Sequence, residues 1–131
     1  MASPTEYRGF NVEQAGAVTV VRFTIPRLLK EATVESLGEQ LLNLIEQQGR
    51  RYLVLDWRQV ERVYSGMLAK LINLHNKVNS LGGQLALCQV QPEVFEVFQT
   101  LRLNHILRIY GTEAEAVQAL SAAAPKAQGP S

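Results

Sequence analysis

Apolar positions recur along the chain in two patterns: alternation with polar residues, which is typical of strands, and helical spacing, which is typical of helices. Residues 10–13 alternate strictly, and residues 17–25 are rich in valine, threonine and phenylalanine. β-Branched and aromatic residues of this kind are enriched in strands. Gly16 lies between the two segments, where a tight turn fits, so we expect a hairpin of two antiparallel strands.

Helical spacing follows the hairpin. Apolar residues fall on one helical face from Val34 to Ile45, with Thr33 as the expected N-cap and Gly49 as the stop. A second helix is predicted over residues 66–81, with Ser65 as the N-cap whose hydroxyl accepts from a free backbone amide.

Two further helices begin at recognisable start signals. Pro92 suits the first turn of a third helix, because the amide hydrogen that it lacks has no helical partner there. Residues 112–115 read Thr-Glu-Ala-Glu, which predicts a capping box at the start of a fourth helix.

Short apolar runs at residues 52–57, 84–90 and 106–110 separate these helices and predict strands. The expected order is therefore ββαβαβαβα. Strands that alternate with helices indicate an α/β fold with a mostly parallel central sheet, an N-terminal hairpin and about four helices. The chain has 131 residues, a length that suits one domain. We expect this domain to span residues 7–121, between a flexible arm at residues 1–6 and a disordered tail at residues 122–131.

Charge and composition narrow the class of partner. The formal net charge is +1, and 47% of the residues are hydrophobic. This balance gives no electrostatic reason to bind nucleic acid or an anionic membrane surface. Residues 1–8 lack a signal-peptide pattern, and no apolar run reaches the roughly 20 residues of a membrane span. With Cys88 as the single cysteine, we expect a protein of the cytoplasm that does not insert into membranes.

Catalytic chemistry finds little support in the sequence. No phosphate-binding glycine motif and no zinc-like spacing of ligands occurs, so we expect no cofactor and no metal. If Ser65 and His75 share a helix, ten residues separate them by about 15 Å, which is too far for a nucleophile and its base. His105 is expected to be a solvated or capping residue, and Cys88 a buried thiol. We therefore expect no enzymatic activity.

The junction from Asp56 to Leu68 is the most distinctive candidate site. Binding sites of open α/β sheets form beyond the carboxyl ends of the strands, and here that end presents a tyrosine, a serine and a helix start. The alternative is that Ser65 only caps the helix and Gly66 only provides space. Trp57 is equally compatible with a core residue and with a surface anchor.

The chain resembles a STAS domain, the fold shared by the tails of sulfate transporters and by bacterial anti-sigma factor antagonists. The resemblance covers nearly the whole expected domain and rests on the order and ungapped spacing of several segments. These segments are residues 53–56, 60–68, 81–88, 92–94, 101–109 and 113–116.

One motif departs from the family pattern. Antagonists of this family typically carry Asp-Ser-Ser-Gly-Leu-Gly at the helix start, where a partner kinase phosphorylates the second serine. This chain has Tyr64 in place of the aspartate, Ser65 at the first serine and Gly66 at the phosphorylated position. The resemblance implies that either Ser65 has taken over the phosphorylation or this copy is not phosphorylated.

The resemblance implies a non-enzymatic, partner-switching module that binds an anti-sigma factor related to serine kinases. The alternative is a STAS subunit docked on a membrane transporter complex for lipids or anions. In either case we expect the partner to contact the junction into the second helix. The candidate contact residues are Asp56, Trp57, Arg62, Tyr64, Ser65, Gly66 and Met67.

Overall fold

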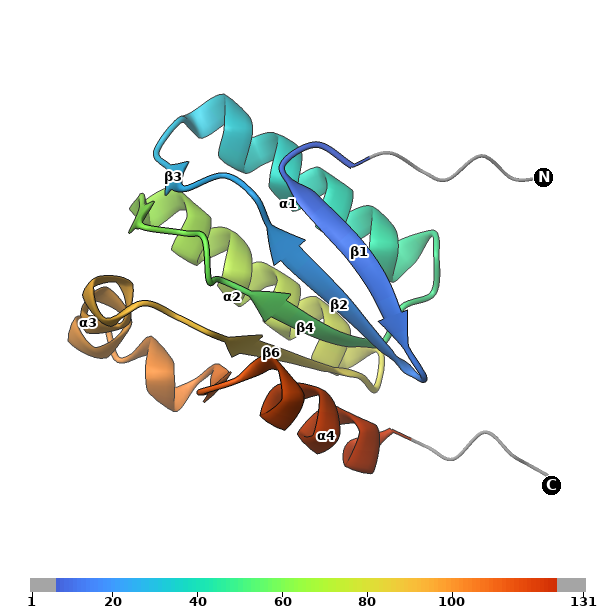
Figure 1. Cartoon of the computed structure of the whole chain (residues 1–131). Coiled ribbons are helices and arrows are strands. Elements are labelled where there is room, and N and C mark those ends of the chain that lie inside the picture. Colours follow the sequence, from blue (N-terminus) through green and yellow to red (C-terminus); the bar gives the residue numbers. More distant parts are fainter. Residues whose placement is uncertain (1–6, 125–131) are drawn as a thin grey trace, which may run out of the picture.

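A computed structural model describes residues 7–124 as a five-stranded sheet covered by helices on both faces (Figure 1). The sheet order is β1-β2-β4-β6-β7. Its strands are β1 (Phe10–Ala15), β2 (Val18–Phe23), β4 (Tyr52–Asp56), β6 (Gln84–Cys88) and β7 (Arg108–Tyr110). The helices are α1 (Glu31–Glu46), α2 (Ser65–Ser80), α3 (Pro92–Thr100) and α4 (Glu113–Ala123).

The pairing of the strands confirms the predicted α/β class. β1 runs antiparallel to β2, with Gly16 at the turn in a left-handed conformation (φ 64°). The pairs β2–β4, β4–β6 and β6–β7 are all parallel. Parallel neighbours require crossover connections, and α1, α2 and α3 with the segment after it supply them.

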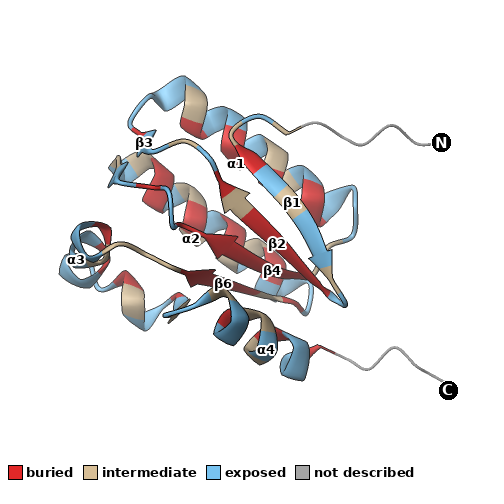
Figure 2. Cartoon of the chain, in the orientation of Figure 1, coloured by how far each residue is buried: buried red, intermediate tan, exposed pale blue. Residues whose placement is uncertain are grey.

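The two faces of the sheet are buried differently. Alternate side chains of β2, β4 and β6, such as Phe23, Leu55 and Leu87, face the large core beneath α1 and α2. The intervening residues, such as Val54 and Cys88, pack against α4. Figure 2 shows the resulting continuous buried band through the central strands.

An aromatic row closes the core at the carboxyl end of β4. The ring centroid of Trp57 lies 5.3 Å from that of Phe23 and 5.8 Å from that of Phe98, both in edge-to-face geometry. Phe10 extends the row beyond Phe23 at 6.3 Å. Edge-to-face contacts place the positive rim of one ring on the negative face of the next. Trp57 is fully buried and is therefore a core residue.

Three short elements and two boundaries differ from the sequence-based expectation. A separate two-stranded parallel sheet pairs β3 (Arg27–Leu28) with β5 (Arg62–Val63), and a 3-10 turn, η1 (Leu103–His105), follows α3. Two-residue strands are too short to leave an alternating pattern. The prediction of Thr33 as N-cap is wrong, because α1 begins three residues earlier than expected and Lys30 is its N-cap.

The start of the predicted tail is also corrected. α4 continues to Ala123, and Ala124 packs at 8% exposure against the α4 side of the sheet. Alanines bury their methyl groups there without losing rotamer freedom, so a run that looked featureless is structured. The predicted arm at residues 1–6 and the remainder of the predicted tail, residues 125–131, lie outside the described residues.

The close approach at Gly83 yields a stability prediction. A Cβ atom at Gly83 would overlap the backbone carbonyl of Arg51, which cannot move aside as a flexible side chain can. We expect Gly83→Ala to lower the free energy of unfolding by about 1–3 kcal/mol in urea denaturation. Gly111→Ala is the control, since its nearest neighbour is the flexible end of Glu115 at 3.4 Å. Equal stability of both variants would contradict the close approach.

Candidate functional site

The candidate site lies where the chain leaves β4 and enters α2. The Trp57 amide donates to the Cys88 carbonyl at 2.9 Å, and the Val60 amide donates back to the Trp57 carbonyl at 2.9 Å. The first bond extends the sheet by one residue, and the second closes a turn. The chain therefore leaves the sheet sharply and exposes the segment that follows.

The β3–β5 pair fixes the segment before α2. The amides of Glu61 and Arg62 both donate to the Pro26 carbonyl, at 2.6 and 3.1 Å. The Tyr64 amide donates to the Leu28 carbonyl at 2.9 Å. These backbone bonds tie the entry of α2 to the segment before α1, so the two form one surface.

Three of the seven predicted contact residues are not available at this surface. Trp57 and Met67 are fully buried, and Asp56 is 3% exposed. The prediction that their side chains contact a partner is wrong for this structure. Trp57 completes the aromatic row, and Met67 points into the core because it lies on the inner face of the first turn of α2.

The other four residues do reach the surface. Arg62 and Ser65 are exposed, and Tyr64 and Gly66 are half-buried. The structure therefore brings Arg62, Tyr64, Ser65 and Gly66 together as one accessible patch at the start of α2.

Ser65 does not cap α2, contrary to the prediction. The N-cap is Tyr64, with extended backbone angles (φ −100°, ψ 148°) and no side-chain cap hydrogen bond. The Tyr64 carbonyl accepts the Met67 amide at 2.8 Å, and Ser65 is already the first helical residue. The Ser65 hydroxyl is therefore free of a structural role at the helix start.

Tyr64 and Gly66 are spatially coupled. A Cβ atom at Gly66 would overlap the aromatic ring and hydroxyl of Tyr64. The ring thus lies over the first turn of α2, in the space that any side chain at position 66 would need. Sequence analysis treated the two positions separately, and the ring's position shows why they belong together.

A groove that sequence analysis missed adjoins this patch. Its volume is about 470 Å³, and it runs between β5 and α3. Leu29 and Val97 line it and are 49% and 37% exposed. Arg62, Glu93 and Glu96 give it charges of both signs. α3 is far from Ser65 in sequence, so only the tertiary structure reveals the contribution of this helix.

A cluster of charged side chains lies at the same end of the sheet. Arg22, on β2, donates through Nε and Nη2 to both carboxylate oxygens of Glu113, at 2.8 and 2.7 Å. Its Nη1 donates to Glu13 at 2.6 Å. Asp56 lies beside Arg22 in the strand register, and its Oδ1 accepts the Arg58 amide at 2.8 Å. The cluster links β1, β2, β4 and the start of α4.

Burial and Arg22 shift the pKa values of Asp56 and Glu113 in opposite directions. Hydrogen bonds from Arg22 lower the pKa of Glu113 to about 2. Burial raises the pKa of Asp56, and the neighbouring Glu113 carboxylate raises it further. Asp56 is therefore the more readily protonated of the two carboxyl groups, because burial and a nearby negative charge both disfavour its charged form.

The remaining candidate groups lie in environments that suppress reactivity. Burial raises the pKa of the Cys88 thiol to about 12, so the reactive thiolate is scarce near neutral pH. The predicted burial of Cys88 is confirmed. His105 lies exposed in η1, as expected for a solvated residue. Within residues 7–124, no three His, Cys, Asp or Glu side chains gather as metal ligands.

Comparisons with known proteins were made against families, sequences and solved structures. The STAS domain model matches residues 10–116. The anti-sigma F factor antagonist of Paenibacillus polymyxa is 25% identical over 70% of this chain and 79% of its own. An anti-sigma-factor antagonist (STAS) domain protein from Planctomyces limnophilus superimposes with a TM-score of 0.74 and 27% identity, over 85% of this chain and 96% of its own.

A membrane protein shares the fold at lower identity. The murine anion transporter Slc26a9 superimposes with a TM-score of 0.69 and 18% identity, over 84% of this chain and 18% of its own. This likeness concerns the fold alone. None of the helices in the described part of this chain is both long and apolar enough to cross a bilayer.

The raised pKa of Asp56 leads to a prediction on pH. A raised folded-state pKa stabilises the fold below the unfolded pKa, and the stabilisation is lost as the pH rises through the folded pKa. Asn at position 56 is uncharged at every pH and keeps an acceptor for the Arg58 amide. We expect Asp56→Asn to unfold at higher urea concentration than the parent at pH 8, and at the same concentration at pH 3.

The matched control is Asp56→Ala, which removes the acceptor of the Arg58 amide and should be less stable than the parent at both pH values. A loss of stability in Asp56→Asn at pH 8 would show that the fold needs the charged aspartate, against the raised pKa of this carboxyl group.

Proposed function

Because the chain belongs to the STAS domain family, we propose that it is a non-enzymatic binding module that docks onto an anti-sigma factor of the serine kinase type in the cytoplasm. The observation that carries this proposal is the exposed start of α2, with the exposed Ser65 beside a groove that contains exposed apolar and charged side chains. The relatives described as anti-sigma factor antagonists support the same class of partner.

The proposed docking surface consists of Arg62, Tyr64, Ser65 and Gly66, with Leu29 and Val97 from the adjoining groove. Tyrosine and arginine are enriched at protein interfaces, where they combine a large contact area with hydrogen bonding. Leu29 and Val97 supply exposed apolar area that a partner would bury. Backbone hydrogen bonds already fix the entry of α2, so little entropy is lost there on binding.

The positions of the chemically active groups favour binding over catalysis. Ser65 and His75 lie ten residues apart on one helix, outside hydrogen-bond reach. Cys88 and Asp56 are buried, and burial raises the pKa of both groups. In this reading Ser65 contributes a contact to the partner rather than a nucleophile.

Ser65→Glu tests the docking surface. The variant adds a negative charge at the centre of the proposed contact, where desolvation costs affinity. We expect it to bind a serine-kinase-type anti-sigma factor of the native host at least about tenfold more weakly in calorimetry, with an unchanged urea midpoint. Tyr64→Ala should also weaken binding.

Asn76→Glu is the matched control, since it places the same charge at an exposed position further along α2. It should bind like the parent. If Ser65→Glu binds as tightly as Asn76→Glu, the docking surface lies elsewhere. Capture of a transporter subunit in place of an anti-sigma factor, in a pull-down from the native host, would favour the transporter alternative.

Phosphorylation gives a separate prediction. Gly66 has no hydroxyl, and Ser65 is the exposed hydroxyl at the helix start. If the partner kinase modifies the site, mass spectrometry after incubation with ATP should find one added phosphate, absent in Ser65→Ala. Because Ser65 makes no cap hydrogen bond, that variant should keep the parent's stability. An unmodified parent chain would identify a constitutive binder without a switch at this site.

A further inference from the structure

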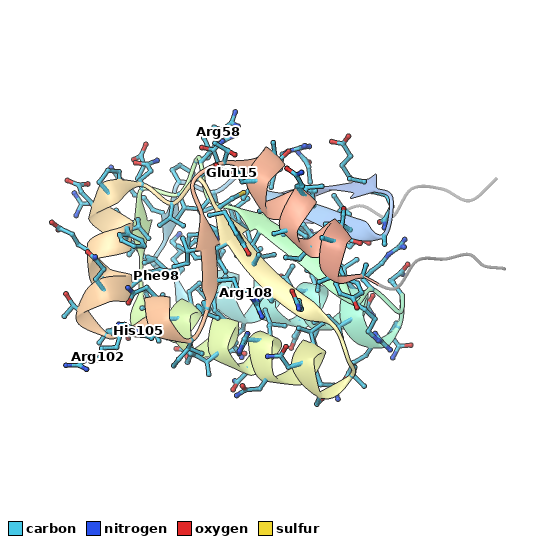
Figure 3. All side chains as sticks on the ribbon, turned by 90° about the horizontal axis from the view of Figure 1, so that it is seen from below. Arg58, Phe98, Arg102, His105, Arg108 and Glu115 are labelled. Atoms are coloured by element: carbon cyan, nitrogen blue, oxygen red, sulfur yellow. The ribbon has the colours of Figure 1, made fainter. Side chains whose placement is uncertain are left out.

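A second groove shares no lining residue with the docking surface. It runs between the C-terminal half of α2 and the edge strand β7, and η1 borders it. Its volume is about 600 Å³, the range of small-molecule sites. His105 and Arg108, labelled in Figure 3, lie along this edge of the sheet.

The lining of this groove is polar and contains no acidic residue. Six of its side chains carry hydrogen-bonding groups, namely His75, Asn79, Asn104, His105, Arg108 and Tyr110. Arg108 is exposed, and it forms no ion pair with any residue in the range 7–124. By contrast, Arg22, Lys70 and Lys77 each have a carboxylate partner. The groove therefore holds an uncompensated positive charge.

Burial and the positive charge of Arg108 both affect the pKa of His75. Burial lowers the pKa of His75, and the positive charge of Arg108 lowers it further. Asn79, one turn along α2, lies with its amide nitrogen 3.0 Å from a ring nitrogen of His75, which suits a neutral imidazole accepting a hydrogen bond. An anion beside Arg108 would remove the repulsion and favour the charged imidazolium.

Asn104 also borders the groove. Its Oδ1 atom is buried and accepts no hydrogen bond from the described residues, so this atom is closed off from the open groove. Contacts to a ligand in the groove therefore come from Arg108 and the neighbouring histidines.

From these contacts we propose that the groove between α2 and β7 binds a small oxyanion, a phosphate ester or a carboxylate. Arg108 pairs with the oxyanion, and His75 and His105 line the remaining wall. This site shares no residue with the proposed docking surface.

Histidine side-chain NMR tests the site on the full chain. We expect inorganic phosphate, titrated at constant ionic strength, to shift the His75 and His105 resonances in a saturable way. The pKa of His75, read from the same spectra, should rise in saturating phosphate. The other charged and titratable groups that line the groove are His105, Arg108 and Tyr110, and Arg108 is the one whose charge the anion would neutralise.

Two variants and a second probe complete the test. Arg108→Ala should weaken phosphate binding at least about tenfold, as expected for loss of a charged partner. Arg27→Ala, an exposed arginine outside the groove, should leave it unchanged. Lactate in place of phosphate identifies a carboxylate preference if it alone saturates. The proposal is overturned if neither probe saturates, or if Arg108→Ala binds as the parent does.

Discussion

Burial of the Trp57 indole at the end of the central strand is the constraint on which the exposed part of the molecule depends. The ring has to pack between Phe23 and Phe98, so β2, β4 and α3 are held together at this end of the sheet. The backbone of the same residue extends the sheet through Cys88 and closes the turn through Val60. The core thus sets the direction in which the chain enters α2. The contacts that hold Trp57 also hold the surface at the start of α2 in place.

The charged cluster stabilises the other side of the same strand end. Arg22 joins Glu113 at the start of α4 to the sheet, and its bidentate geometry fixes both distance and orientation. A negative side chain also suits a helix N-terminus, whose free amide groups carry partial positive charge. Burial raises the pKa of Asp56, which lowers the cost of burying this carboxyl group because its neutral form becomes easier to reach.

Local signals in the sequence predicted most of the fold. Thr112 and Glu115 form the expected capping box, because all its atoms come from four consecutive residues. The parallel sheet followed from the alternation of strands and helices. The failures needed information from distant residues. Ser65 looked like an N-cap, yet the Tyr64 amide is held by Leu28, thirty-six positions away, and α2 begins one residue earlier than expected.

The junction that the sequence indicated is exposed, but only some of the residues predicted there reach the surface. Arg62, Tyr64, Ser65 and Gly66 reach the surface, whereas burial of Trp57 and Met67 depends on packing partners that sequence spacing does not reveal. The contribution of α3 and the pairing of Arg22 with Glu113 arise from contacts across long stretches of chain. Patterns of one helix or one strand carry no trace of such contacts.

The ring of Tyr64 over Gly66 has a consequence for substitution at position 66. In the family pattern, a serine stands where this chain has Gly66, and an aspartate stands where it has Tyr64. A mutation that restored the serine alone would meet the far end of the tyrosine ring, so the ring would have to rotate away from the first turn of α2. The residue at position 66 thus decides where the half-buried tyrosine side chain lies on this surface.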